Sequence, residues 1–263
     1  MRRAPAPAKL NLALVVGCPR DDGKHELTTV YQRLDLGDRI AIEEGSFEVR
    51  GFAADTIVGR ALHALAEAAG VEPRWRATIT KRIPVASGLG GGSSDAATAL
   101  RLAAETLDEP PDLEPLARSL GADVPFFLRP GPQLGEGDGG ELRALDLPQD
   151  YWVVLALPPG AHKESTATVY DGYEGAEGYE ERRAHLLETL ALVHRPRDLA
   201  ALPPNDLASS PLAAELLRLG AFRADVSGAG PIVYGLFHRR ASAEAARKVL
   251  RARTWLTIPA WYG

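Results

Sequence analysis

The stretch PVASGLGGGSSDAATAL, residues 84–100, limits the possible folds of this chain more than any other. It places four glycines and three serines directly ahead of an alanine-rich segment with helical periodicity, and the strand-like segment RATITKRI, residues 76–83, precedes it. The first turn of a helix exposes unpaired backbone N–H groups and the positive end of the helix dipole, and both attract anions. Glycines also let a phosphate approach the backbone closely. The segment therefore predicts a strand, a phosphate-binding turn and a helix that starts near Ser94.

Two common phosphate-binding motifs do not fit this turn. A P-loop requires a lysine after its last glycine, and no lysine lies between these glycines and the helix. The dinucleotide fingerprint G-x-G-x-x-G matches at Gly88 and Gly90, but Ser93 stands at its third position and the surrounding βαβ repeats are absent. A helix entry whose glycines serve only tight packing stays open as an alternative.

Composition and charge exclude several classes of protein. The 263 residues suffice for one large or two ordinary domains, and the formal net charge of −5 argues against nucleic acid or an anionic membrane as the main partner. Cys18 is the only cysteine, so neither an intramolecular disulfide nor a thiolate metal cluster can form. No stretch reaches the roughly 18 apolar residues that span a bilayer. We expect a cytoplasmic protein, either a monomer or a weak homodimer, with no nucleic-acid or membrane partner.

The order of periodic segments predicts an α+β fold. A continuous apolar run at 151–158 predicts a central strand that is buried on both faces. The glycine- and proline-rich segment 129–141 predicts a hairpin or a seam between domains. We expect a two-domain α/β sandwich with halves 1–145 and 146–263. Other expected strands are 38–44, 76–83, 231–237 and 254–260, and expected helices are 56–70, 94–107, 113–122, 179–193, 210–221 and 242–253.

Three further motifs carry polar residues in unusual places. Lys9 and Asn11 are two residues apart in an otherwise apolar strand, so they share a face, and a lysine that points toward a core needs a partner or a ligand. Asp123 follows a helix-ending glycine and precedes Val-Pro, although a solvated turn is an alternative. A second glycine-rich turn, residues 225–230, directly precedes a strand, and ordinary turn chemistry could also explain it.

Taken in order, these motifs resemble the three-motif pattern of the GHMP kinase superfamily. The matching segments are PAKLNL at 7–12, residues 84–100, GADVPFFL at 121–128 and SGAGPIVYGLF at 227–237. Together with DGKHEL at 22–27 and STATVY at 165–170, the segments PAKLNLAL, LGGGSSDAA and LGADVPFFL are most similar to one branch of this superfamily. That branch phosphorylates a cytidine diphosphate-linked methylerythritol in the non-mevalonate isoprenoid pathway.

The resemblance implies ATP in the N-terminal half, this small-molecule substrate in a cleft between the halves, and Mg²⁺ bridging the ATP oxygens. Asp123 would be the general base for the 2-hydroxyl of the substrate, with the catalytic Lys9 beside it. The implied ATP-binding residues are Pro84, Gly88, Leu89, Gly90, Gly91, Gly92, Ser93 and Ser94. The implied substrate-binding residues are Asn11, Lys24, His25, Tyr170, Ser227, Gly228 and Gly230, and no residue is assigned as a metal ligand.

Two positions depart from the pattern of the superfamily branch. Lys24 stands where relatives usually carry an aromatic residue, and Thr56 where they usually carry an asparagine. Lys24 leaves open a kinase of the same superfamily that acts on another alcohol, and a non-catalytic nucleotide-binding regulator on the same fold is a second alternative. The intact pair of Lys9 and Asp123 favours an enzyme. His162 and Lys163 could reach a diphosphate or belong to a solvated loop.

Overall fold

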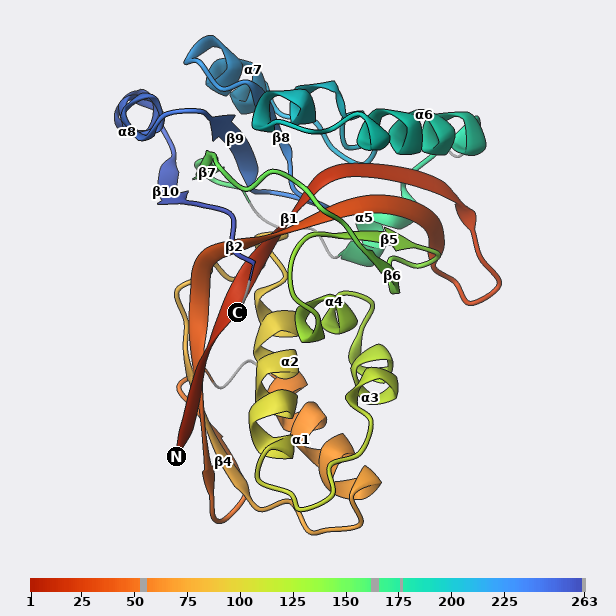
Figure 1. The fold of residues 1–263 in the computed structure, drawn as a ribbon, viewed down its shortest axis with the longest axis vertical. Coiled ribbons are helices and arrows are strands. Elements are labelled where there is room, and N and C mark those ends of the chain that lie inside the picture. The colour runs from red at the N-terminus through yellow and green to blue at the C-terminus, as the bar shows by residue number, and fades with distance from the viewer. Residues whose placement is uncertain (53–55, 162–165, 176, 262–263) are drawn as a thin grey trace.

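The computed structural model describes residues 1–52, 56–161, 166–175 and 177–261. These residues form two sheets with helices packed against them, which confirms the predicted α+β class (Figure 1). The first sheet has the strand order β3-β4-β2-β5-β6, with β1 paired to β2. Its strands are β1 (Arg2–Pro19), β2 (His25–Glu44), β3 (Glu48–Arg50), β4 (Trp75–Thr80), β5 (Gln133–Glu136) and β6 (Glu141–Ala144).

The second sheet is antiparallel throughout, with the order β10-β7-β9-β8. Its strands are β7 (Trp152–Leu157), β8 (Arg223–Val226), β9 (Val233–Phe237) and β10 (Arg253–Thr257). The helices of the N-terminal part are α1 (Thr56–Ala68), α2 (Gly91–Ala104), α3 (Leu113–Leu120) and α4 (Val124–Leu128). Those of the C-terminal part are α5 (Thr166–Asp171), α6 (Tyr179–Ala191), the 3₁₀ helix η1 (Pro196–Ala201), α7 (Pro211–Arg218) and α8 (Arg240–Val249).

Strands β1 and β2 form one long antiparallel hairpin that serves both parts of the molecule. In Figure 1 the hairpin rises from the lower sheet and passes beneath α6. Leu10 and Leu12 of β1 are fully buried in the same apolar cluster as Leu155 of β7 and Tyr234 of β9. Strand β1 therefore packs against residues from both halves of the chain.

The two apolar clusters around β7 explain its sequence. Val153 and Leu155 face the cluster shared with β1, whereas Val154 and Ala156 face the cluster under α7 and α8. Successive side chains of a strand point to opposite faces, so a strand covered on both sides needs an unbroken apolar run. The predicted central strand at 151–158 is confirmed.

Most predicted elements are present, with two differences near the glycine-rich turn. Helix α2 begins at Gly91 rather than near Ser94, so its first turn consists of Gly91, Gly92, Ser93 and Ser94. The motif after Asp123 is not only a turn but the short helix α4, because Pro125 suits the first positions of a helix, where its missing N–H costs nothing. The hairpin predicted at 129–141 is confirmed as β5 and β6. The domain boundary at 145 stays a prediction, and the strands change sheet between β6 and β7.

Candidate active site

A cavity of about 650 Å³ opens where the β1–β2 hairpin, the glycine-rich turn and the start of α4 meet. Predicted residues from distant parts of the chain line it together, among them Lys9, Asp123 and the turn from Gly88 to Ser93. A cavity of this size suits a small-molecule ligand. No helix in the described part of the chain is both long and apolar enough to cross a membrane.

Lys9 and Asp123 form an ion pair in the wall of this cavity. The Lys9 Nζ lies 3.3 Å from Asp123 Oδ2 and donates a hydrogen bond of 2.8 Å to Asn11 Oδ1. Lys9 and Asn11 share a face of β1, as their spacing predicted, and the Asn11 amide donates in turn to Thr29 Oγ1 at 2.8 Å. The Lys9 side chain is nearly buried, while that of Asp123 is 32% exposed toward the cavity. The carboxylate is therefore held by a cation and still accessible to a ligand.

The glycine-rich turn lies directly against Lys9. The Lys9 backbone N–H donates to Leu89 O at 3.0 Å, and a Cβ on Gly90 would come within 3.0 Å of Lys9 Cγ. Gly90 caps α2 with φ of 70°, a left-handed conformation that favours glycine. The first N–H groups of α2 have no acceptor inside the helix and begin at the cavity wall. This geometry suits an anion beside the Lys9 ammonium.

The second glycine-rich turn packs against the first. A Cβ on Gly88 would meet Ser227 O at 2.6 Å and Gly230 O at 2.7 Å, so the close approach of two backbones requires glycine at position 88. Gly228 lines the cavity, whereas Ser227 and Gly230 do not. Ser227 is fully buried and accepts a hydrogen bond from the Asn11 backbone N–H at 3.3 Å. Ser227 and Gly230 thus pack against residues that line the cavity and do not line it themselves.

Ser94 also lies behind the wall, in the second half of the first turn of α2. It is fully buried, and its backbone N–H donates to Gly90 O at 2.9 Å. The other seven predicted ATP-binding residues do line the cavity.

Lys81 is a cavity residue that the sequence analysis missed. Its ammonium lies 2.5 Å from Asp38 Oδ2 and 2.8 Å from Asp95 Oδ2, next to the start of α2. Burial would lower the pKa of Lys81, but these two carboxylates raise it above the usual lysine value. Asp95 therefore holds a lysine rather than simply favouring the helix dipole. The sequence did carry a signal for this residue. Every second side chain of the strand faces inward, and the series Ala77, Ile79 continues to Lys81.

Lys24, His25 and Tyr170 also line the cavity. The His25 and Tyr170 rings lie 5.7 Å apart, and His25 Nδ1 lies 2.9 Å from Gly17 O. A carbonyl can only accept, so Nδ1 carries the proton, which leaves Nε2 of the neutral ring as an acceptor. Lys24 forms an ion pair with Asp138 of the β5–β6 turn. Burial of Asp138 would raise the pKa of its carboxyl group, but the hydrogen bond from Lys24 holds this pKa below its usual range.

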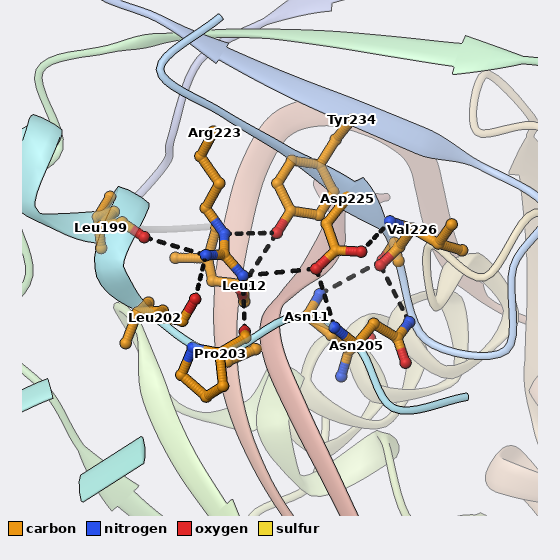
Figure 2. Close-up of polar contacts among 12 residues, drawn as sticks. Asn11, Leu12, Leu199, Leu202, Pro203, Asn205, Arg223, Asp225, Val226 and Tyr234 are labelled. Carbon is orange, nitrogen blue, oxygen red and sulfur yellow. Dashed lines mark hydrogen bonds and ion pairs between the residues drawn. The ribbon is translucent and has the colours of Figure 1, made fainter. Parts of the chain in front are cut away.

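A buried polar network centred on Arg223 supports the site from the C-terminal half (Figure 2). The guanidinium donates to the Leu12 carbonyl at 2.5 Å, one residue beyond Asn11. Asn205 donates to Gly228 O at 2.7 Å, and its backbone N–H donates to Asp225 Oδ2 at 2.9 Å. The other acceptors of Arg223 are Asp225, Tyr234 and the carbonyls of Leu199, Leu202 and Pro203.

The described residues offer no group of three histidine, cysteine or acidic side chains that could hold a metal ion. The chemistry of the cavity suits a Mg²⁺ ion that arrives on a nucleotide, because Mg²⁺ keeps several waters and takes few protein ligands. The side chain of Thr56 and all of His162 and Lys163 lie outside the described residues.

Comparisons with known proteins identify the family of the chain. The family model for the GHMP kinases N terminal domain matches residues 56–131, which include the glycine-rich turn and Asp123. The model for GHMP kinases C terminal matches residues 194–254, which include the second glycine-rich turn. A mevalonate kinase from Methanococcus jannaschii shares the fold, with a TM-score of 0.72 over 100% of this chain and 98% of that chain at 13% identity. The fold is therefore that of a GHMP kinase.

Closer relatives narrow the family. A 4-diphosphocytidyl-2-C-methyl-D-erythritol kinase from Anaeromyxobacter sp. is 38% identical, covering 93% of this chain and 85% of its own, and one from Geobacter sulfurreducens is 37% identical, covering 95% of both. A crystal structure of 4-(cytidine 5'-diphospho)-2C-methyl-D-erythritol kinase superposes with a TM-score of 0.79 at 33% identity, covering 98% of this chain and 99% of that one. The chain belongs to the 4-diphosphocytidyl-2-C-methyl-D-erythritol kinase family of the GHMP kinases.

Proposed function

We propose that the protein transfers the γ-phosphoryl group of ATP to the 2-hydroxyl of 4-diphosphocytidyl-2-C-methyl-D-erythritol, a step in isoprenoid precursor synthesis. The observation that carries the proposal is the Lys9–Asp123 ion pair, open to the cavity beside the glycine-rich turn. Family membership supports the same activity, since the relatives carry this name.

Asp123 accepts the proton of the 2-hydroxyl while the hydroxyl oxygen bonds to the γ-phosphorus. The bond from that phosphorus to the oxygen bridging to the β-phosphate breaks, and ADP leaves with the electron pair. A positioned base contributes about 10²- to 10⁴-fold to such a step. Lys9, 3.3 Å from Asp123 Oδ2, orients the carboxylate and neutralises charge near the attacking oxygen.

The turn from Gly88 to Ser93 holds the ATP phosphates through the N–H groups of the first turn of α2, with Ser94 as a buried support. Pro84 lies at the entrance to this turn and lines the cavity beside the nucleotide. A Mg²⁺ ion carried by ATP beside the first turn of α2 would supply neutralisation of the phosphate charge.

The substrate occupies the other end of the cavity. His25 Nε2 accepts from the cytosine amino group, Tyr170 supplies an aromatic wall and Asn11 binds the methylerythritol hydroxyls. Lys24 contacts the diphosphate after it exchanges its Asp138 partner for the more highly charged ligand. Gly228 contacts the substrate at the wall that Ser227 and Gly230 support.

The test is turnover of ATP, Mg²⁺ and this substrate by the purified protein, followed as ADP release and as the mass of the phosphorylated product. Asp123→Asn should lower kcat by at least about 10³-fold with unchanged ATP binding. Asp108→Asn, an exposed aspartate on the loop after α2, is the matched control and should turn over normally. If the wild type binds ATP but leaves this substrate unchanged, the protein is a GHMP kinase for another alcohol. If no alcohol is phosphorylated, it is a nucleotide-binding regulator.

The location in the cytoplasm and the state as a monomer or weak homodimer stay predictions. Size-exclusion chromatography with light scattering tests the second of them.

A further inference from the structure

Tyr31 of β2 lines the cavity and contacts the proposed base, yet neither the motifs nor the resemblance assigns it a role. Its hydroxyl donates to Asp123 Oδ1 at 3.1 Å, while the other carboxylate oxygen, Oδ2, lies 3.3 Å from Lys9 Nζ. The two oxygens of Asp123 therefore have different partners from two different strands.

The phenol ring is fixed on several sides. Lys9 Nζ lies 5.3 Å from its centroid, and the Phe126 ring lies 5.0 Å away. A Cβ added to Gly135 would meet Tyr31 Cε2 at 2.6 Å, and one added to Gly139 would meet the hydroxyl oxygen at 2.7 Å. The β5–β6 hairpin thus presents bare backbone where it passes over the tyrosine. The ring has little room to move the hydroxyl away from Asp123.

Electrostatics keep this phenol in the protonated form. Burial raises the pKa of Tyr31 well above its usual value, and the negative charge of Asp123 adds to the effect. Across neutral pH the hydroxyl is a donor to the carboxylate. Other titratable groups that face the pair are Lys9 from β1, Tyr170 from α5 and Asp138 from the β5–β6 turn.

We propose that Tyr31 is a positioning residue for Asp123: its hydroxyl occupies Oδ1 and fixes the carboxylate plane, so that Oδ2 beside Lys9 receives the substrate proton. This inference rests on the proposed function of Asp123 as base.

The test is Tyr31→Phe, which removes one oxygen atom and keeps the ring. We expect kcat to fall about tenfold because the carboxylate loses its fixed orientation. The KM for ATP should not change. The KM for the alcohol substrate should also stay unchanged, so that the loss falls on kcat alone. A variant with the wild-type kcat, or one that loses activity through KM alone, would overturn the proposal.

Tyr151→Phe is the matched control. Tyr151 is also buried, and its hydroxyl has no hydrogen-bond partner among the described residues, so kcat should not change. If both variants lose the same activity, loss of a buried hydroxyl is the cause and the proposal fails.

The double variant Tyr31→Phe with Asp123→Asn separates this proposal from the proposed function. If Tyr31 acts through Asp123, the double variant has the rate of Asp123→Asn alone, and a further tenfold loss overturns the proposal. Near-normal turnover of Asp123→Asn alone would instead remove Asp123 as base. Should Tyr31→Phe fail to fold, wild-type protein made with 3-fluorotyrosine provides the test. Its more acidic phenol donates more strongly to Asp123 Oδ1, so kcat should change while the KM for ATP does not, and an unchanged kcat overturns the proposal.

Discussion

Lys9 and Arg223 are both buried cations beside strand β1, with 5% and 6% of their surface exposed, and each pairs with an aspartate. They differ in how far the protein satisfies them. Arg223 donates to six oxygen atoms, and its partner Asp225 is nearly buried. The Lys9 ammonium has two oxygen partners among the described residues and lines the cavity with the more exposed Asp123.

The difference separates structural from chemical use of a buried charge. A guanidinium whose donors are all occupied by carbonyls, a hydroxyl and a carboxylate joins segments of the chain and has no capacity left for a ligand. An ammonium with few partners in a cavity wall keeps a donor for the reacting group. Substitutions at the two cations should therefore have opposite signatures.

Lys9→Met should have the largest effect, and it should be on rate. We expect kcat to fall about 10³-fold, because the variant loses the charge beside Asp123 and the developing phosphoryl charge. The apolar stem still packs against Gly90, so the midpoint of thermal unfolding should change by only a few degrees. Steady-state ADP release and calorimetry measure the two quantities. Lys248→Met, at an exposed position on α8, is the control. Unfolding of the Lys9 variant at assay temperature would assign Lys9 to the structural class.

Arg223→Met should reverse this signature. Removing a buried cation leaves the Asp225 carboxylate and several carbonyls without their donor, so we expect the free energy of unfolding to fall by about 3 kcal/mol. Urea unfolding measures this loss. Arg197→Met, at an exposed arginine on the neighbouring η1, should leave stability unchanged. Equal stability of the two variants would show that the network in Figure 2 does not stabilise the fold.

The same contrast explains which parts of the site the sequence could predict. The sequence predicts Lys9 and Asn11 because alternation along one strand is a local pattern. Lys81 shows the same alternation directly after β4. The glycine-rich turn was found because glycine, serine and the following periodicity are also local. The fold class followed from the mixture of the two periods.

Contacts between distant segments gave no such signal. Tyr31 and Asp123 are 92 residues apart, and the residues joined by Arg223 extend from Leu12 to Tyr234. A tyrosine on a strand and an arginine before a glycine-rich turn are ordinary in any sequence. Their roles depend on tertiary packing that periodicity does not encode.

Gly90→Ala tests the cavity wall next to Lys9, where the glycine-rich turn packs against the lysine. The added Cβ would lie 3.0 Å from Lys9 Cγ and from Phe127 Cζ, at a φ of 70°. We expect the KM for ATP to rise about tenfold, since the first turn of α2 must shift, and stability to fall by about 1 kcal/mol. Gly70→Ala is matched in backbone, with φ of 65° and nothing within 4 Å of the added Cβ, so it should lose similar stability with unchanged kinetics. Equal KM values for the two variants would contradict a phosphate-binding role of the turn.

The smallest predicted effect concerns Asp225, the carboxylate that pairs with Arg223. Burial raises the pKa of Asp225, although Arg223 and the N–H groups of Val226 and Asn205 act in the opposite direction. The folded protein therefore binds this proton more tightly than the unfolded chain does. The stabilisation is fully present at pH below the ordinary aspartate pKa and is lost as the pH rises through the raised value.

Asp225→Asn should abolish this part of the pH dependence. We expect the free energy of unfolding of the wild type to fall by up to about 1 kcal/mol, relative to that of the variant, as the pH rises from 4 to 7. Urea unfolding of both proteins across this range measures the difference in slope, which is independent of any constant loss from the weaker acceptor. Parallel curves would mean that Arg223 fully compensates the burial of its partner. The two pairs would then differ in the exposure of their carboxylates and in the number of oxygen partners of their cations.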